Sequence, residues 1–434
     1  MEQPQKLKRS LGPWMLWGLG VGYVISGMYF GWNLGLEKGG TLGLAVATAF
    51  IIVLYLCFTF SYTELACAIP KAGGAFDYAT KALGKDWGFL AGMAQNIEFI
   101  FAPPAIAFAI GAYLNLFIPS LSVLSIAIIA YLIFTGLNIY GVKAAASFEL
   151  VITVIAVVEL LIFAGAAYPS FEWQNLERNA LPNGWSGAFA AIPFAIWFFL
   201  AIEGVANVAE ETINPQRNIL IGFGSAILTL VVLCLLTFTA SVGVAGWETI
   251  VYPEPGAEPS DSPLPLALAH SLGQSHVLYK AVTSIGLFGL VASFHGIILA
   301  AGRATFEFGR VGYAPERLGK VHRRFQTPAN ALLVNMAIGI IALFTGKTGE
   351  IITIACFGAL TLYIVSMVSV LVLRKKAPNM DRPFKVPLFP LTPILALVIA
   401  SVAFAAIILY NLPLALIYFG LLAIAFIWFK ISQK

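Results

Sequence analysis

The stretch that decides the fold is Phe189 to Pro215, FAAIPFAIWFFLAIEGVANVAEETINP. It is long and apolar enough to cross a membrane as a helix, which takes about 20 mostly apolar residues. Glu203 nevertheless stands in its middle, directly before Gly204, and the acidic pair Glu210 and Glu211 lies near its end. A charged side chain at the centre of a bilayer costs at least about 2.5 kcal/mol. Glu203 therefore predicts a cavity, a compensating partner or a function inside the membrane.

The composition predicts an integral helical membrane protein. The chain has 434 residues, of which 59% are hydrophobic and only 11% are charged, and apolar stretches of spanning length recur throughout it. Its net charge of +4 gives no reason to expect a nucleic-acid partner, because the basic residues fall in short loops. The four cysteines are scattered singly, without metal-ligand spacing, and no nucleotide motif is present. We therefore expect no cofactor, no metal site and no ATP-driven pump, but a lipid bilayer around the chain.

Twelve membrane spans are predicted, joined by short connections with no room for a soluble domain. The first apolar run is too long for a cleavable signal peptide. The approximate limits of the spans are 14–36, 41–67, 87–117, 121–139, 147–168, 187–211, 218–246, 277–308, 329–345, 350–373, 391–410 and 413–430.

The basic residues predict the orientation of the chain. If the N-terminus lies in the cytoplasm and the spans alternate, 21 of the 25 basic residues fall inside. Cytoplasmic loops carry such an excess of Lys and Arg. The acidic, Pro-rich segment 247–276 then lies outside. We therefore expect a multi-pass protein of the cytoplasmic (inner) membrane with both termini in the cytoplasm.

Two spans carry signs of a broken helix. Span 1 is dense in glycine before Ser26-Gly27, and each interior glycine weakens a helix by about 1 kcal/mol. We expect a local break there and a second one around Phe199 to Gly204 in span 6. Interrupted spans in corresponding positions of two halves indicate a transporter site near the midplane. Because they lie five spans apart, the halves would be inverted repeats. The predicted division is 1–13 as a cytoplasmic tail, 14–186 and 187–390 as five-helix repeats, and 391–434 as two appended helices.

Five segments along the chain carry a family resemblance. IPKAGGAFDYATKALG, LNIYGVKAAASFE, EGVANVAEETINPQRNI, AGRATFEFGRVGYAPERLGKVHRRFQTP and RPFKVPLFPLTP resemble, in this order, segments of the amino acid–polyamine–organocation (APC) transporters. The resemblance implies a LeuT-type fold with a 5+5 inverted repeat and helices 1 and 6 broken. It also implies a secondary active transporter that works by alternating access, and not an enzyme.

Within this superfamily the chain is most similar to bacterial ethanolamine permeases, notably in FAIWFFLAIEGVANVAEETINPQRNI. Amino acid carriers of the family usually have Gly-Ser-Gly at the span-1 break, where backbone N–H groups hold the substrate carboxylate. Here the run is Ile25-Ser26-Gly27-Met28, with one glycine missing. This departure favours a solute with an ammonium group and no carboxylate. A carrier of amino acids or polyamines remains the alternative, and a non-transporting sensor on the same fold is a remote one.

An ammonium solute needs a carboxylate for a charge-assisted hydrogen bond and benefits from aromatic faces. Glu203 is either this counter-ion or the cap that keeps the helix broken. Glu98 in span 3 is a second candidate acid, three residues after Gln95 and on the same helix face. The candidates for the substrate site are Tyr23, Ile25, Ser26, Gly27, Gln95, Glu98, Phe101, Trp197, Phe198, Phe199, Ala201, Glu203 and His295.

The resemblance also implies a cation site between spans 1 and 8, for which H⁺ and Na⁺ both remain open. Some proton-coupled relatives place a span-5 lysine there, and Ala156 stands at that position here. His295 changes charge near neutral pH and suits a proton relay, although a structural role is the alternative. The coupling and gating candidates are Glu149, Glu159, Ser293, Glu210 and Glu211. Glu64, at the end of span 2, is expected to pair with a loop cation.

Overall fold

The computed structural model describes residues 9–71, 73–140 and 145–432. Three predicted features therefore lie partly outside the described residues: the N-terminal tail (1–8), the IPKAGG segment (Ala72) and the LNIYGVKAA segment (141–144). The last two residues, 433–434, are also outside.

The described residues are almost entirely helical, and they contain no strand beyond an isolated bridge between Leu11 and Thr212. The helices are α1 (Pro13–Val24), α2 (Ser26–Tyr29), α3 (Asn33–Ala68), α4 (Ala75–Leu83), α5 (Lys85–Asn115), α6 (Val123–Tyr140), α7 (Ala145–Ala167), η1 (Tyr168–Ser170), α8 (Trp173–Glu177), α9 (Gly184–Ala190), α10 (Ile192–Trp197), η2 (Ile202–Glu211), α11 (Pro215–Ala245), α12 (Trp247–Val251), α13 (Pro263–Leu272), α14 (Val277–Arg310), η3 (Glu316–Gly319), α15 (Ala329–Leu343), α16 (Thr348–Lys376), α17 (Leu391–Tyr410) and α18 (Leu412–Ser432).

The long helices stand side by side and make a multi-pass membrane protein. Ten segments of the described chain are long and apolar enough to cross a membrane. The two other predicted spans correspond to the divided segment that begins with α1 and to α15, which has only 15 residues. Large exposed apolar side chains lie on α6, α7, α11, α17 and α18. This outward apolar surface is the one that lipid covers.

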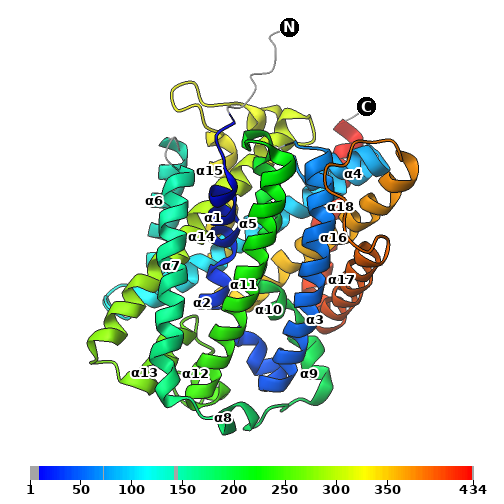
Figure 1. Ribbon diagram of the computed structural model, residues 1–434. Coiled ribbons are helices and arrows are strands. Elements are labelled where there is room, and N and C mark those ends of the chain that lie inside the picture. Colours follow the sequence, from blue (N-terminus) through cyan, green and yellow to red (C-terminus); the bar gives the residue numbers. More distant parts are fainter. Residues whose placement is uncertain (1–8, 72, 141–144, 433–434) are drawn as a thin grey trace.

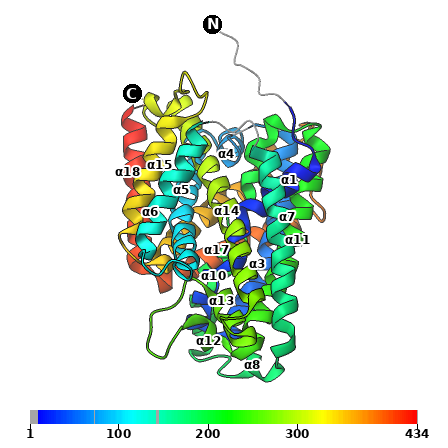
Figure 2. The same ribbon diagram turned by 90° about the vertical axis from the view of Figure 1, so that its left-hand side faces the viewer.

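Two views show how the helices are grouped. The start of α1 and the end of α18 lie at the same end of the molecule as α4, while α8, α9 and α12 lie at the opposite end (Figure 1). In the second view α1, α7 and α11 stand together on one side, and α5, α6, α15 and α18 on the other (Figure 2). The helices α1, α7 and α11 contact one another, as do α5, α6 and α15, while α18 packs on α5 and α14 contacts both groups.

Span 6 is broken where the sequence predicts it. After α10 ends at Trp197, Ala201 adopts a left-handed backbone with φ of 74°. The chain then continues as η2, a ten-residue 3-10 helix, although 3-10 runs longer than three or four residues are uncommon. The backbone of span 6 therefore leaves the regular α-helical pattern directly before Glu203.

Span 1 is interrupted twice. The first interruption is a change of hydrogen-bond pattern at Ile25, directly before the predicted Ser26-Gly27 position, where the backbone itself stays right-handed helical with φ of −59° and ψ of −23°. A larger one follows one turn later, where Phe30 is fully extended and Gly31 has φ of +86°, a conformation that favours glycine. The chain becomes helical again at Asn33, and Gly40, with φ of +63°, separates the end of span 1 from span 2. The extended backbone thus lies beyond the predicted Ser26-Gly27 break.

The glycine cluster that suggested a break serves helix packing instead. α1 runs without interruption through Gly18, Gly20 and Gly22. A Cβ atom on Gly18 would lie 2.9 Å from a Leu150 side-chain carbon of α7, and one on Gly20 would lie 2.9 Å from Val205 of η2. These glycines allow α7 and η2 to approach α1 closely, as small residues do at membrane helix interfaces.

Candidate binding site within the membrane

Glu98 and Glu203 form a buried pair of acids at the span-6 break. Neither residue has any exposed surface, and their carboxyl groups lie close enough to interact electrostatically. Glu98 Oε1 accepts the backbone N–H of Ala201 at 3.2 Å, so a span-3 side chain caps the broken helix. Two ionised carboxylates in contact inside a membrane repel each other. The pair therefore requires a cation, either a proton or an ammonium group.

The second carboxyl of the pair has a different environment. Glu203 Oε2 accepts the hydroxyl of Tyr363 at 3.1 Å, and the carboxyl lies beside its own backbone N–H. Glu203 Oε1 and Glu98 Oε2 have no hydrogen-bond partner among the described residues. Buried polar atoms are normally paired, and each unpaired one costs about 1–3 kcal/mol. Each glutamate thus keeps one oxygen available for a donor.

An aromatic cluster contacts this pair through the Tyr363 hydroxyl. The hydroxyls of Tyr55 and Tyr363 are 3.1 Å apart, and the Tyr55 ring lies 5.1 Å from that of Phe199. Trp197 Nε1 donates to the Phe30 carbonyl at 3.0 Å, which ties the extended part of span 1 to span 6. Complete burial of both glutamates means that the site is closed to both ends of the molecule.

Two other predicted aromatic residues have different roles. Phe198 stacks on Trp32, with ring centroids 5.6 Å apart, and belongs to the packing between spans 1 and 6. Phe101 is partly exposed, whereas the other predicted substrate-site residues are buried. Tyr55 and Tyr363 were not predicted, because an isolated tyrosine in an apolar span gives no periodic or motif signal.

Spans 1 and 8 meet at two serines. Ser26 Oγ and Ser293 Oγ are 2.8 Å apart, and Ser293 donates to the Tyr23 carbonyl at 2.6 Å. The Tyr23 ring lies against Gly204 and Gly296, where an added Cβ atom would come within 2.9 and 2.7 Å of it. The structure thus brings together the predicted residues Tyr23, Ser26 and Ser293 next to the interruption at Ile25.

Gly27 lies where span 1 packs on the backbone of span 6, and its replacement by alanine should impair transport at least tenfold. A Cβ atom there would lie 2.5 Å from the Trp197 carbonyl oxygen and 3.1 Å from Phe198 Cα. Both atoms belong to the backbone and cannot rotate away, so the spans must separate, which typically costs about 1–3 kcal/mol. Uptake into liposomes and thermal unfolding measure the two effects. Gly165→Ala is the control, since its Cβ would meet nothing within 4 Å; equal uptake by both variants would contradict the prediction.

Three of the predicted polar residues lie between span 5 and its neighbours rather than beside the paired glutamates. His295 Nδ1 is 3.9 Å from Glu149 Oε2, and Glu149 Oε1 has no partner among the described residues. Ten residues further along α7, Glu159 Oε2 accepts the Tyr29 hydroxyl at 2.5 Å, and that hydroxyl also lies 3.2 Å from the Ala156 carbonyl. His295 therefore contacts Glu149 and Phe134, and its predicted place in the substrate site stays a prediction.

Ion pairs and hydrogen bonds close the end of span 6 that is nearest the chain termini. Glu211 binds Arg303 of α14 at 3.0 Å, and its carbonyl accepts the N–H groups of Ser10 and Leu11. Gln95 Nε2 donates to Asn207 Oδ1 at 3.3 Å, and both residues line a pocket that also includes Glu307. Glu210 lies near enough to Glu307 and Asp77 for electrostatic interaction. The contacts of Glu211 suit a gate or a structural lock.

A vestibule opens at the opposite end, and its charge is negative. Four acids and two lysines line it, and Lys347 pairs with Glu350 at 2.7 Å. Burial raises the pKa of Asp261 from 3.8 to about 6, although the hydroxyl of Thr348, which donates to Oδ2 at 2.9 Å, partly offsets this. The charged residues of the vestibule are Glu37, Lys38, Glu258, Asp261, Lys347 and Glu350.

Asp261 should make the stability of the protein fall as the pH rises from about 4 to about 6. Its pKa is raised from 3.8 to about 6, so in this window the folded protein holds the proton that the unfolded chain loses. The melting temperature of Asp261→Asn minus that of the wild type should therefore be larger at neutral pH than below pH ~4. Thermal unfolding in detergent across this range tests the prediction, with Glu258→Gln as the control; a pH-independent difference would refute it.

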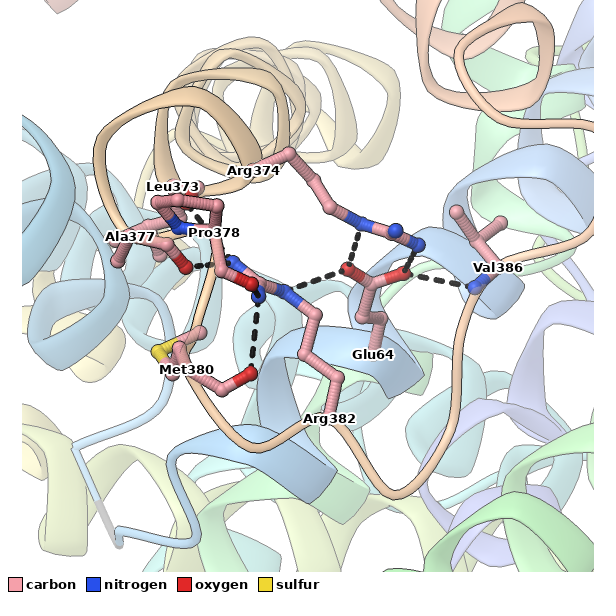
Figure 3. A network of polar contacts seen from close by, with 8 residues as sticks. All are labelled: Glu64, Leu373, Arg374, Ala377, Pro378, Met380, Arg382 and Val386. Carbon is pink, nitrogen blue, oxygen red and sulfur yellow. Dashed lines mark hydrogen bonds and ion pairs between the residues drawn. The ribbon is translucent and has the colours of Figure 1, made fainter.

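Glu64 pairs with basic residues as the sequence predicts, in a network at the end of the molecule that carries the chain termini (Figure 3). Arg374 binds it through two bonds of 2.7 and 2.8 Å, Arg382 Nε lies 3.4 Å away, and the Val386 N–H donates at 2.7 Å. Arg382 also donates to four backbone carbonyls that follow or end α16. Those carbonyls belong to Leu373, Ala377, Pro378 and Met380.

An all-helical membrane bundle with two broken spans and a buried pair of acids at one of the breaks is typical of a transporter. The amino acid permease family matches residues 11–428, so the chain belongs to this family and to the APC superfamily. It is therefore a permease and not an enzyme.

Three relatives are similar over most of their length. An uncharacterized transporter of Rhizobium meliloti is 29% identical, with 94% of this chain and 89% of the relative covered. The methylthioribose transporter of Bacillus subtilis is 28% identical, with 94% and 89% covered. The branched-chain amino acid permease BcaP of the same organism is 26% identical, with 91% and 87% covered. The last two names differ in their solutes, and all three name membrane transport.

Proposed function

We propose that this permease imports a small organic amine, with ethanolamine as the substrate that fits best, by ion-coupled alternating access. The observation that carries the proposal is the pair of Glu98 and Glu203, which are completely buried and each have one oxygen without a partner. An ammonium group between them would donate to both oxygens and balance the excess negative charge. Charge-assisted hydrogen bonds of this kind are about twice as strong as neutral ones.

The surroundings of the pair support an ammonium solute over one with a carboxylate. Tyr55, Tyr363 and Phe199 offer aromatic faces, each of which adds about 0.5–2 kcal/mol for a cation. A substrate carboxylate would instead meet two acids. The outer vestibule, with four acids against two lysines, would attract cations to the entrance. The hydroxyl of ethanolamine could bond with the serines or tyrosines at the span-1 interruption.

The orientation is part of the same proposal. With both ends of the chain in the cytoplasm of a cell, the vestibule at Asp261 faces outward and the Glu211–Arg303 pair faces inward. The paired glutamates would then be reached from outside past Trp197 and Phe30. Substrate release would require the Glu211–Arg303 contact to open. The membrane concerned is the cytoplasmic (inner) membrane, as the distribution of basic residues predicts.

The alternative is a carrier of amino acids or polyamines, which is favoured by relatives named as carriers of branched-chain and cationic amino acids. A single experiment separates these functions. Liposomes that contain the purified protein are loaded with unlabelled solute, and uptake of labelled ethanolamine by counterflow is measured. The competitors are choline, putrescine, alanine, leucine and arginine. We expect saturable ethanolamine uptake that the amino acids do not inhibit. Uptake of a neutral amino acid without competition by ethanolamine would refute the proposed substrate.

A further inference from the structure

A basic pocket lies between the end of α16 and the start of α17, at the end of the molecule that carries the chain termini (Figure 3). Its volume is about 380 Å³, which leaves room for a phosphate-sized group. The segment 374–385, which forms it, has five basic residues and a single acid. The residues that line the pocket are Arg374, Pro378, Met380, Asp381, Arg382 and Lys385. None of them takes part in the transport function proposed above.

The two arginines of the pocket are only partly neutralised inside the protein. Both contact Glu64, so one carboxylate faces two guanidinium groups (Figure 3). Arg382 is buried, and its N–H groups are directed to Glu64 and to four backbone carbonyls. Arg374 uses only Nε and Nη2 for Glu64, and its guanidinium, which has five N–H donors in all, is partly exposed. An anion that entered the pocket would therefore find free donors on Arg374.

The lysines of the same segment add positive charge that no acid balances. Among the described residues, Lys375, Lys376 and Lys385 form no ion pair, and all three are exposed. Lys376 donates to the neutral Ala82 carbonyl at 3.3 Å, whereas Lys385 lines the pocket itself. Asp381, the acid of the segment, is also exposed at the pocket. The pocket thus keeps an excess of positive charge that favours an anionic ligand.

Exposed apolar side chains continue from the pocket along the lipid-facing side of α17. Leu388 and Leu391, at the start of this helix, are 75% and 60% exposed. Leu395 and Val398 are exposed as well, four and seven residues after Leu391, so the three share one face of the helix. Because α17 is long and apolar enough to cross a membrane, the pocket lies where the hydrocarbon layer ends. A ligand that fits both features has a negative head group and apolar chains.

We propose that this pocket binds the head group of an anionic phospholipid, whose acyl chains lie along α17. The phosphate accepts charge-assisted hydrogen bonds from Arg374 and Lys385, and the planar guanidinium suits phosphate geometry. Basic pockets between membrane helices are typical sites for such head groups. A lipid bound here joins the end of α16 to the start of α17, next to the Val386 N–H that donates to Glu64.

The test measures lipid binding to the full-length protein in an uncharged detergent, by native mass spectrometry and by thermal unfolding. The probes are dioleoyl phosphatidylglycerol, dioleoyl phosphatidylcholine and glycerol 3-phosphate, which represent an anionic lipid, a zwitterionic lipid and a soluble phosphate. We expect the protein to retain at least about fivefold more phosphatidylglycerol than phosphatidylcholine, and only phosphatidylglycerol to raise the melting temperature. Glycerol 3-phosphate at the same concentration should change neither readout.

Lys385→Glu should lower the retention of phosphatidylglycerol at least about fivefold, because it reverses a charge that lines the pocket. The side chain is exposed and lies outside the Glu64 network, so the fold is kept. Lys385→Gln removes the charge without reversing it and should lower retention in the same direction but less. Lys320→Glu is the matched control, since this lysine of the loop before α15 is also exposed, and it should retain the lipid like the wild type.

Four results would overturn the proposal. Unchanged retention in Lys385→Glu, or an equal loss in Lys320→Glu, would show that the pocket is not the site. Equal retention of the two lipids would show that the head group is not recognised. Stabilisation by glycerol 3-phosphate equal to that by the lipid would assign the pocket to a soluble phosphate. None of these measurements involves transport, so the proposed substrate stands or fails independently.

Discussion

Replacing Glu203 by glutamine is expected to weaken ethanolamine binding by roughly 30-fold to a few thousandfold while the protein still folds. Truncating one partner of a buried, hydrogen-bonded charge pair costs about 2–5 kcal/mol, which corresponds to this range. Glutamine has nearly the same shape and can still accept the Tyr363 hydroxyl, now 3.1 Å from Glu203 Oε2. The variant thus loses the charge and keeps the packing.

Binding of labelled ethanolamine to purified protein measures this effect, with size-exclusion chromatography as the check on folding. Glu316→Gln is a matched control for charge removal, because the Glu316 side chain is 85% exposed in its pair with Lys320. Glu98→Gln tests the other acid. Near-normal affinity in Glu203→Gln together with a large loss in Glu98→Gln would assign the counter-ion to Glu98 and would contradict the role proposed for Glu203.

Replacing Glu64 by glutamine is expected to destabilise the protein by about 3–5 kcal/mol, because it leaves an arginine buried without its counter-ion. The side chain of Arg382 is only 3% exposed, and its other bonds go to neutral carbonyls. Arg374 keeps access to water, since 22% of its side chain is exposed, and it also lies over the Phe389 ring at 4.5 Å. The loss therefore falls mainly on Arg382 and on the segment that follows α16.

Thermal and denaturant unfolding in detergent measure this loss. The double variant Glu64→Gln/Arg382→Gln should recover part of the stability, because it removes both buried charges and completes a mutant cycle. Glu316→Gln breaks the exposed pair with Lys320 and should change stability by less than about 1 kcal/mol. If Glu64→Gln were as stable as the exposed control, the loss of the buried counter-ion would have no cost, and the prediction would be wrong.

The sequence by itself determined the membrane fold and the places where it departs from regular helix. The length of the apolar runs predicts the spans, because a helix needs about 20 mostly apolar residues to cross a bilayer. Glu203 in an apolar run predicts the span-6 break, which the left-handed Ala201 confirms. The acidic end of span 2 predicts the pairing of Glu64 with loop cations. Each of these inferences depends on residues that are close together in the chain.

Only the tertiary structure decided which distant groups meet. Tyr55 and Tyr363 are 308 residues apart, and no local pattern reveals that their hydroxyls lie next to each other above Glu203. The cap of the broken helix comes from Glu98, a side chain that the sequence presents only as a candidate acid for the substrate. Likewise the glycine cluster of span 1 predicts a locally weak helix from sequence. In the structure the same glycines leave space for neighbouring helices to pack closely.

The stretch from Phe189 to Pro215 shows both what the sequence determines and what only the tertiary structure decides. An acid inside an apolar span has a large solvation cost that can be read from sequence, so the existence and location of a site follow from composition. Which group compensates that cost depends on the packing of spans 2, 3, 6 and 10 around the break. Packing is a property of surfaces that meet in three dimensions, and therefore the partners of Glu203 appear only in the folded chain.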